Sequence, residues 1–210
     1  YKRQGIFPAE LVAEFVKCRD QVPAEDFHVV RDVVERDLGA PLEAIFASFE
    51  RVPIAAASIA QVHAATLRDG TEVVVKVQRP TVDRLVHQDL RVMAWLAPYL
   101  VGRIPITALA NPPALVEVFA HTISEELDFR VEADNMIDVA RVFAELGQDQ
   151  FVVPRPHPEL VTRRVLVMEK LSGFSFDDLE SYAAHGVDTH AVVRALSLIH
   201  ISEPTRPLHI

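Results

Sequence analysis

Two apolar runs joined by a tight turn constrain the fold of this chain more than any other feature of its sequence. The runs extend over residues 58–62 and 71–78, and the segment between them contains Asp69 and Gly70. An Asp-Gly pair adopts the backbone angles of a short hairpin turn at little cost. We therefore predict a β-hairpin with Lys76 near the far end of its second strand.

Helical periodicity dominates much of the remaining sequence. Three helices are predicted in the N-terminal part of the chain: one over residues 8–20, one that begins at residues 23–26, and a short one within 38–49. Two long helices are predicted further on, one after Pro80 and one over 115–146. Two further strands are predicted within 152–160 and 161–171. This order predicts an α+β fold, in which helices are inserted among the strands of a small antiparallel sheet.

The charge and hydropathy of the chain exclude several classes of protein. With 30 acidic and 21 basic residues, the formal net charge is -9. Broad nucleic-acid binding needs a basic surface, so no nucleic-acid partner is expected. No apolar run reaches the ~18 residues of a membrane-spanning helix, and no signal-peptide layout opens the chain, so we expect a cytoplasmic location. The histidines lack metal-ligand spacing, so no metal site is predicted.

Lys76 is the first candidate for chemistry. It lies in EVVVKVQRP, where strand alternation puts its side chain on one face with Val74 and Gln78. One interpretation is an edge-strand lysine that discourages aggregation. The other comes from protein kinases, whose VAIK strand carries a lysine that neutralises nucleotide phosphate and pairs with a helix glutamate.

The second candidate is a run of small residues before the hairpin, comprising Ala55, Ala56, Ala57 and Ser58. Small side chains let backbone N–H groups approach a phosphate closely. Alanine resists the positive φ angles that glycine supplies, so such a loop should be stiffer than a glycine-rich one. The alternative is a tight helix-to-strand crossing that merely needs small residues.

The third candidate is the acidic segment EELDFRVEADN within the predicted helix over 115–146. Asp128 and Glu132 are four residues apart, which places them on one helical face, with Glu125 and Asn135 close to that side. The segment could equally be a solvated face. The order of loop, hairpin, strand lysine and acidic helix nevertheless matches the ATP-binding half of a kinase-like fold.

The segments PIAAASIAQVH, EVVVKVQRP and EELDFRVEADN together resemble the AarF/UbiB family of atypical protein-kinase-like proteins. CRDQVPAEDF and LGAPLEAIFASF fit the N-terminal extension of that family, and the resemblance spans residues 5–196. It implies a kinase-like N-lobe with inserted long helices, an N-terminal helical extension and a truncated C-lobe. The implied domains are the extension (1–50), the N-lobe (51–175) and the start of the C-lobe (176–196).

The resemblance also implies roles for individual residues. The nucleotide loop would be Ala55, Ala56, Ala57 and Ser58, and Lys76 would be the phosphate-binding lysine with Glu132 as its ion-pair partner. Glu126 and Asp128 would form the ExD motif, which contacts the N-terminal extension where a protein substrate would otherwise dock. The backbone at Glu169 and Leu171 would meet the adenine edge in the hinge between the lobes.

Two departures from the family pattern, in the KxGQ motif and in the catalytic segment, limit these roles, and the C-terminal tail is a separate feature. The spacing of Lys2 and Gln4 does not give the KxGQ motif expected before residue 5. No aspartate follows Asp188, so the catalytic loop and the metal-binding aspartate expected beyond residue 196 are absent. Residues 197–210 resemble translated sequencing-adapter read-through, so we expect no function for His200, Glu203 or Arg206.

For the parent protein, the resemblance implies binding of ATP with Mg²⁺ by an atypical kinase or ATPase linked to isoprenoid quinone biosynthesis or membrane lipid homeostasis. Its implied partners are an isoprenoid lipid or quinone-biosynthesis proteins, and its implied location includes attachment to the inner face of the membrane. The fragment itself is expected not to turn over ATP. The alternative is a non-catalytic pseudokinase-like scaffold, or a module that binds a lipid or partner protein.

Overall fold

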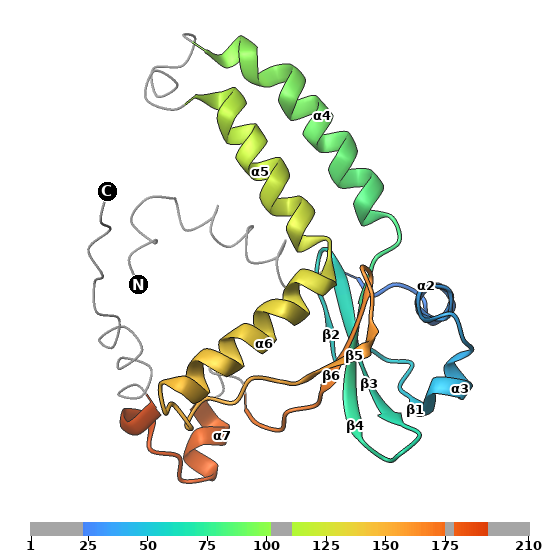
Figure 1. The fold of residues 1–210 in the computed structure, drawn as a ribbon, viewed down its shortest axis with the longest axis vertical. Helices are drawn as coiled ribbons and strands as arrows, with labels where there is room; N and C mark the ends of the chain where they lie inside the picture. Colours follow the sequence, from blue (N-terminus) through green and yellow to red (C-terminus); the bar gives the residue numbers. More distant parts are fainter. Residues whose placement is uncertain (1–22, 102–110, 175–178, 193–210) are drawn as a thin grey trace. The chain divides into compact units, whose positions relative to one another are not determined.

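The computed structural model describes residues 23–101, 111–174 and 179–192 (Figure 1). Its contacts divide the chain into two units, one of Tyr1–Val142 with Val153–Lys170, the other of Phe143–Val152 with Leu171–Ile210. The helix predicted over 8–20, the KxGQ position and the predicted artefactual tail lie outside the described residues. The candidate nucleotide-binding elements belong to the first unit, except for Leu171.

The first unit is built on an antiparallel sheet whose strands follow the order β1-β3-β4-β6-β5, with β2 paired to β3. The strands are β1 (Phe46–Phe49), β2 (Ala55–Ala56), β3 (Ala60–Leu67), β4 (Glu72–Gln78), β5 (Pro156–Val161) and β6 (Val165–Glu169). Helices accompany this sheet, so the predicted α+β class is confirmed.

The predicted hairpin is the pair β3–β4. Its register runs from Ala60 opposite Gln78 to Thr66 opposite Glu72. The turn contains Gly70 at φ 89°, and the Asp69 carboxylate accepts the backbone N–H of Thr71 at 2.9 Å. The first strand is longer than the apolar run at 58–62 indicated, because it continues to Leu67.

Helices cover both faces of the sheet (Figure 1). Helix α2 (Phe27–Leu38) packs three buried valines against one face, which Val73, Val75 and Val77 line from β4. Helix α6 (Phe129–Glu145) covers the other face, where Phe129 packs on Leu166. Val73, Val75 and Val77 thus face α2, whereas Lys76 and Gln78 bond to partners on the opposite face, so the alternation predicted for β4 is confirmed.

The stretch predicted as a third helix forms two different elements. Helix α3 covers only Leu42–Ile45, and β1 follows at once. Phe46 is buried opposite Leu67 of β3, and its ring meets that of Phe49 edge-on at 5.4 Å. Pairing with β3 buries Phe46 and partly buries Phe49, so tertiary packing overrides the local helical pattern.

The long helix predicted over 115–146 is also two helices in the structure. Helix α4 (Val82–Leu100) is followed by α5 (Pro112–Glu126), and α6 begins only at Phe129. The helical hydrogen bonds lost at the break, at Leu127 and Asp128, are replaced by bonds to other partners. The backbone N–H of Phe129, for example, donates to the carbonyl of Arg163 at 3.0 Å. In the second unit, α7 covers Leu179–Ala184.

Candidate functional site

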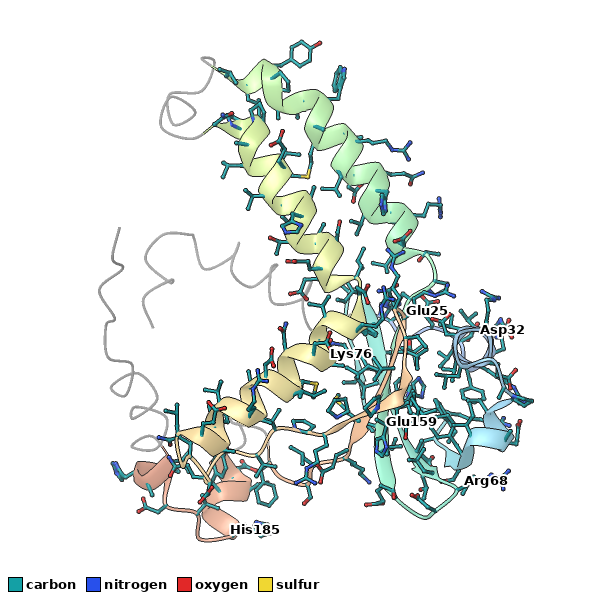
Figure 2. All side chains as sticks on the ribbon, viewed as in Figure 1. Glu25, Asp32, Arg68, Lys76, Glu159 and His185 are labelled. Carbon is teal, nitrogen blue, oxygen red and sulfur yellow. The ribbon has the colours of Figure 1, made fainter. Side chains whose placement is uncertain are left out.

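Lys76 lies in the interior of the sheet. Strand β4 runs between β3 and β6, and Lys76 is paired with Val62 on one side and Leu166 on the other. The edge-strand interpretation of this lysine is therefore wrong. Its side chain points toward α6, on the face opposite the α2 core (Figure 2).

The ammonium of Lys76 is held by Glu132 of α6. Nζ donates to both carboxylate oxygens, at 2.9 Å and 2.6 Å, and lies 4.8 Å from the ring centroid of Phe129. The side chains of Lys76 and Glu132 are 23% and 38% exposed, so the pair is reached by solvent on one side. An ammonium has three N–H groups, and one of them is left for a ligand.

The start of α6 is fixed to the sheet by two long-range hydrogen bonds. The Nε2 of Gln78 donates to the carbonyl of Leu127 at 2.9 Å, and the N–H of Phe129 donates to Arg163. Phe129 is fully buried. Because Glu132 lies one helical turn after this anchor, its carboxylate is held over Lys76.

Sequence reasoning missed the anchoring roles of Gln78 and Phe129. Gln78 shares the face of Lys76 by simple strand alternation. Phe129 lies three residues before Glu132, which places the two on the same side of a helix. Both signals were in the sequence, but neither indicates which carbonyl or cation the side chain contacts.

The run of small residues lies in register with Lys76. Ala55 of β2 is opposite Val62 of β3, and Val62 is opposite Lys76, so the three form a row across the sheet. At ~4.8 Å per strand spacing, Ala55 and Lys76 are about 10 Å apart. Among the described residues only glycines have positive φ, so Ala57 and Ser58 turn the chain without left-handed backbone.

A cavity of about 510 Å³ opens beside the Lys76–Glu132 pair. Three further acidic side chains line it, from Glu125, Glu126 and Asp128. Its size is that of a small-molecule site. The carboxylates outnumber the single ammonium, so an anionic ligand would need a cation with it to enter.

Glu126 is the last residue of α5, and Asp128 lies in the break just before α6. Asp128 was predicted to share a helical face with Glu132, but it precedes α6 and caps it, accepting the N–H of Arg130 at 3.1 Å. The Arg130 guanidinium also donates to this carboxylate, at 2.9 Å and 2.6 Å. These hydrogen bonds from Arg130 lower the pKa of Asp128 below its usual value.

The predicted hinge residues lie at the end of β6. Glu169 ends this strand, and its own backbone N–H donates to the carbonyl of Arg155 at 2.8 Å. Leu171 is 42% exposed and is the first residue of the second unit's C-terminal segment. The structure thus brings Lys76, Glu132, Glu126 and Asp128 together around one cavity. The small-residue run lies two strands from Lys76, and the adenine contacts of Glu169 and Leu171 stay predictions.

The described part of the chain has neither a metal-ligand cluster nor a helix that could span a membrane. Residues 23–101, 111–174 and 179–192 contain no group of three or more His, Cys, Asp and Glu side chains arranged to hold a metal ion. Over the same ranges, no helix has both the length and the hydropathy needed to cross a bilayer.

The protein family of this chain follows from its similarity to known proteins. Residues 17–205 match the model of the ABC1 atypical kinase-like domain. The chain belongs to the ABC1 atypical kinase-like family. This match and the relatives below confirm the resemblance to the AarF/UbiB proteins, and they confirm the kinase-like N-lobe as the fold of the sheet and its helices.

Curated relatives include proteins named "Probable protein kinase UbiB" from Aeromonas salmonicida, Tolumonas auensis and Vibrio parahaemolyticus, which are 35%, 34% and 35% identical to this chain over 187 residues. Each alignment covers 89% of this chain and 34% of the relative, so the chain spans about a third of the length of these ABC1-family proteins.

A solved structure is also similar to this chain. It is the complex of Rv3197 with erythromycin from Mycobacterium tuberculosis, with a TM-score of 0.59 and 30% identity. The match covers 80% of this chain and 42% of that one.

Proposed function

We propose that the first unit binds ATP, together with Mg²⁺, as the N-lobe of an atypical kinase or ATPase. The observation that carries this proposal is the ion pair between Lys76 and Glu132, which connects an interior sheet strand to the helix that covers it. Kinase-like sites use such a pair to present a fixed positive charge to the phosphates of a nucleotide.

The chain's own residues would act mainly through position and charge. Glu132 holds the Lys76 ammonium in place with two hydrogen bonds and leaves its third N–H for a phosphate oxygen. The backbone of the Ala55–Ser58 run, in register with Lys76, is not screened by long side chains. Phosphoryl transfer depends mostly on such positioning and charge neutralisation.

The acidic surroundings of Lys76 explain why the nucleotide should arrive with a divalent cation. Glu125, Glu126, Asp128 and Glu132 line the cavity. When bound with the nucleotide, Mg²⁺ offsets phosphate charge that these carboxylates would repel. We propose that its protein ligands belong to the part of the family's fold that lies beyond this chain.

For the full-length protein we propose a role in isoprenoid quinone biosynthesis or membrane lipid homeostasis. This proposal is supported by the family resemblance and by the UbiB relatives. Peripheral or anchored attachment to the inner face of the membrane is part of the same proposal.

Thermal unfolding with and without Mg·ATP tests the nucleotide proposal. We expect Mg·ATP to raise the melting temperature of the wild type and not of Lys76→Ala. Arg68→Ala is the matched control, because this exposed cation lies at the turn of the β3–β4 hairpin, away from Lys76 and the hinge, and should keep the shift. An equal shift in wild type and Lys76→Ala would contradict a phosphate site at Lys76.

A non-catalytic binding module is the second candidate function, and the apolar surface of α4 and α5 favours it. Trp95 and Tyr99 of α4 are 67% and 50% exposed, with ring centroids 5.4 Å apart, and Val118 and Phe119 of α5 are also exposed. Contiguous exposed apolar side chains mark interaction sites.

Flotation with phosphatidylcholine–phosphatidylglycerol vesicles tests a lipid partner for this surface. Vesicle binding that survives Lys76→Ala and is lost in Trp95→Glu supports a lipid-binding module. If the wild type does not bind the vesicles, a lipid-binding module is contradicted.

A further inference from the structure

Arg79 connects the run of small residues to a distant segment of the chain. All three guanidinium nitrogens donate a hydrogen bond, and the side chain of Arg79 is 11% exposed. Nε donates to the carbonyl of Ala57 at 2.9 Å, Nη1 to the carboxylate of Glu25 at 3.0 Å, and Nη2 to the carbonyl of Pro23 at 2.6 Å. One side chain therefore fixes two segments that lie more than 30 residues apart in sequence.

The backbone of Arg79 holds the same run from its other end. Its N–H donates to the carbonyl of Ile59 at 2.9 Å, while the N–H of Ala57 donates to the carbonyl of Ala60 at 2.8 Å. Ser58 therefore lies between the carbonyl groups of Ala57 and Ile59, and both of these accept a hydrogen bond from Arg79. The bend at Ser58 is closed without glycine and without a positive φ angle.

The segment that leads into α2 is held by Gln61 of β3 as well as by Arg79. The N–H of Glu25 donates to Oε1 of Gln61 at 2.8 Å, and Gln61 is buried in β3. The carboxylate of Glu25 accepts from Arg79. Figure 2 labels Glu25 near the end of the sheet from which α2 departs. Movement of this segment would therefore strain its bonds to both Arg79 and β3.

We propose that Arg79 is a positioning residue that holds the run Ala55–Ser58 in one shape by tying it to residues 23–26. The part of this inference that concerns nucleotide affinity rests on the proposed function. The part that concerns loop order rests on the hydrogen bonds of the loop alone. A loop that is ordered before the ligand arrives does not lose that freedom on binding, so affinity rises. The loop and the segment before α2 should also respond together to a ligand at either one, because coupling between sites is reciprocal.

Arg79→Lys is the most informative variant. A lysine keeps the positive charge, but its single ammonium cannot span the three acceptors that the planar guanidinium binds. Arg84→Lys is the matched control, since Arg84 is exposed on α4. Glu25→Gln is the milder second variant, which weakens the link to the segment before α2 and leaves the bond from Arg79 to Ala57 intact.

Amide hydrogen exchange without nucleotide measures loop order directly. We expect exchange at Ala57 to be about tenfold faster in Arg79→Lys than in wild type, which is the change expected for loss of one net hydrogen bond. Amides of the central strands, such as Val75 and Val167, should exchange as in wild type. Arg84→Lys should match wild type throughout, and unchanged exchange at Ala57 in Arg79→Lys would overturn the proposal.

Mg·ATP titration of the same proteins completes the test. The dissociation constant should rise about tenfold in Arg79→Lys and by a smaller factor in Glu25→Gln, with no change in Arg84→Lys. Mg·ATP should also slow exchange over residues 24–27 in wild type and not in Arg79→Lys. Faster exchange at Ala57 in Arg79→Lys with an unchanged dissociation constant for Mg·ATP overturns a positioning role for Arg79. If the wild type binds no nucleotide, the proposed function is overturned, and the exchange result still tests the order of the loop.

Discussion

Gln78 donates a hydrogen bond through Nε2 to the carbonyl of Leu127 at 2.9 Å, across 49 residues of sequence. This bond joins the strand that carries Lys76 to the turn that precedes the helix carrying Glu132. The two residues of the ion pair are thus fixed to each other through the backbone as well as through their side chains. The geometry of the pair depends on this anchor.

Replacing Gln78 by Met should destabilise the protein by about 1–3 kcal/mol, because the buried carbonyl of Leu127 loses its donor while side-chain volume is kept. Leu127 is 1% exposed, so water cannot easily replace that donor. Urea unfolding measures the change in the free energy of unfolding. Gln88→Met, on the exposed face of α4, is the control and should change it little. Equal stability of Gln78→Met and wild type would show that the bond contributes nothing.

His63 should make stability depend on pH in the weakly acidic range. It is fully buried, Nδ1–H donates to the carbonyl of Glu50, and Nε2 accepts from the Gln61 amide, each at 2.8 Å. Burial lowers the pKa of His63 below its ordinary value of 6.5, although the bond to Glu50 opposes this shift. The neutral ring is the form that fits this network.

The sign of the effect follows from proton uptake. As pH falls through 6.5, the unfolded chain gains a proton on His63 that the folded chain does not, so the free energy of unfolding falls. Above that pH the contribution is fully present. Urea unfolding at pH 5 and pH 7 should therefore show a smaller loss on acidification in His63→Asn than in wild type. An identical loss in both proteins would contradict a buried neutral histidine.

Asp128 should stabilise the start of α6. Asp128→Ala removes the acceptor for the Arg130 N–H, and loss of such a cap costs about 1 kcal/mol. Because the pKa of Asp128 is lowered in the folded protein, the contribution of its carboxylate is present above the ordinary value of 3.8 and disappears as pH falls through the lowered one.

Thermal unfolding of three variants separates capping from charge. Asp128→Asn should recover most of the stability lost in Asp128→Ala, since Asn also caps helices. Asp134→Ala, an exposed acid within α6, should have little effect. If Asp134→Ala and Asp128→Ala were equally destabilised, general helix charge rather than capping would account for the change.

The hairpin and the face of Lys76 could be predicted because both follow from local rules. The Asp69-Gly70 turn fixes a short connection, and strand alternation alone puts Lys76, Val74 and Gln78 on one face. The pairing of Lys76 with Glu132 could be expected only from the family resemblance. Nothing within either segment indicates that residues 56 positions apart should meet.

The features that the sequence analysis missed depend on distant partners. The helical pattern continues through Leu127 and Asp128, and the break occurs because Gln78 and the carbonyl of Arg163 satisfy the backbone there. Phe46 lies in a strand because β3 pairs with it. Local pattern therefore indicated the type of most elements, while their ends and long-range bonds required the fold.

Covalent labelling with an acyl-phosphate derivative of ATP tests the central claim most directly, because this probe acylates a lysine that lies against the nucleotide phosphates. The chain has four lysines, Lys2, Lys17, Lys76 and Lys170, so peptide mass spectrometry can assign the modified residue. We expect labelling at Lys76, suppressed by excess Mg·ATP and reduced in Glu132→Gln. Labelling spread evenly over the four lysines, and unaffected by Mg·ATP, would contradict a nucleotide site at the Lys76–Glu132 pair.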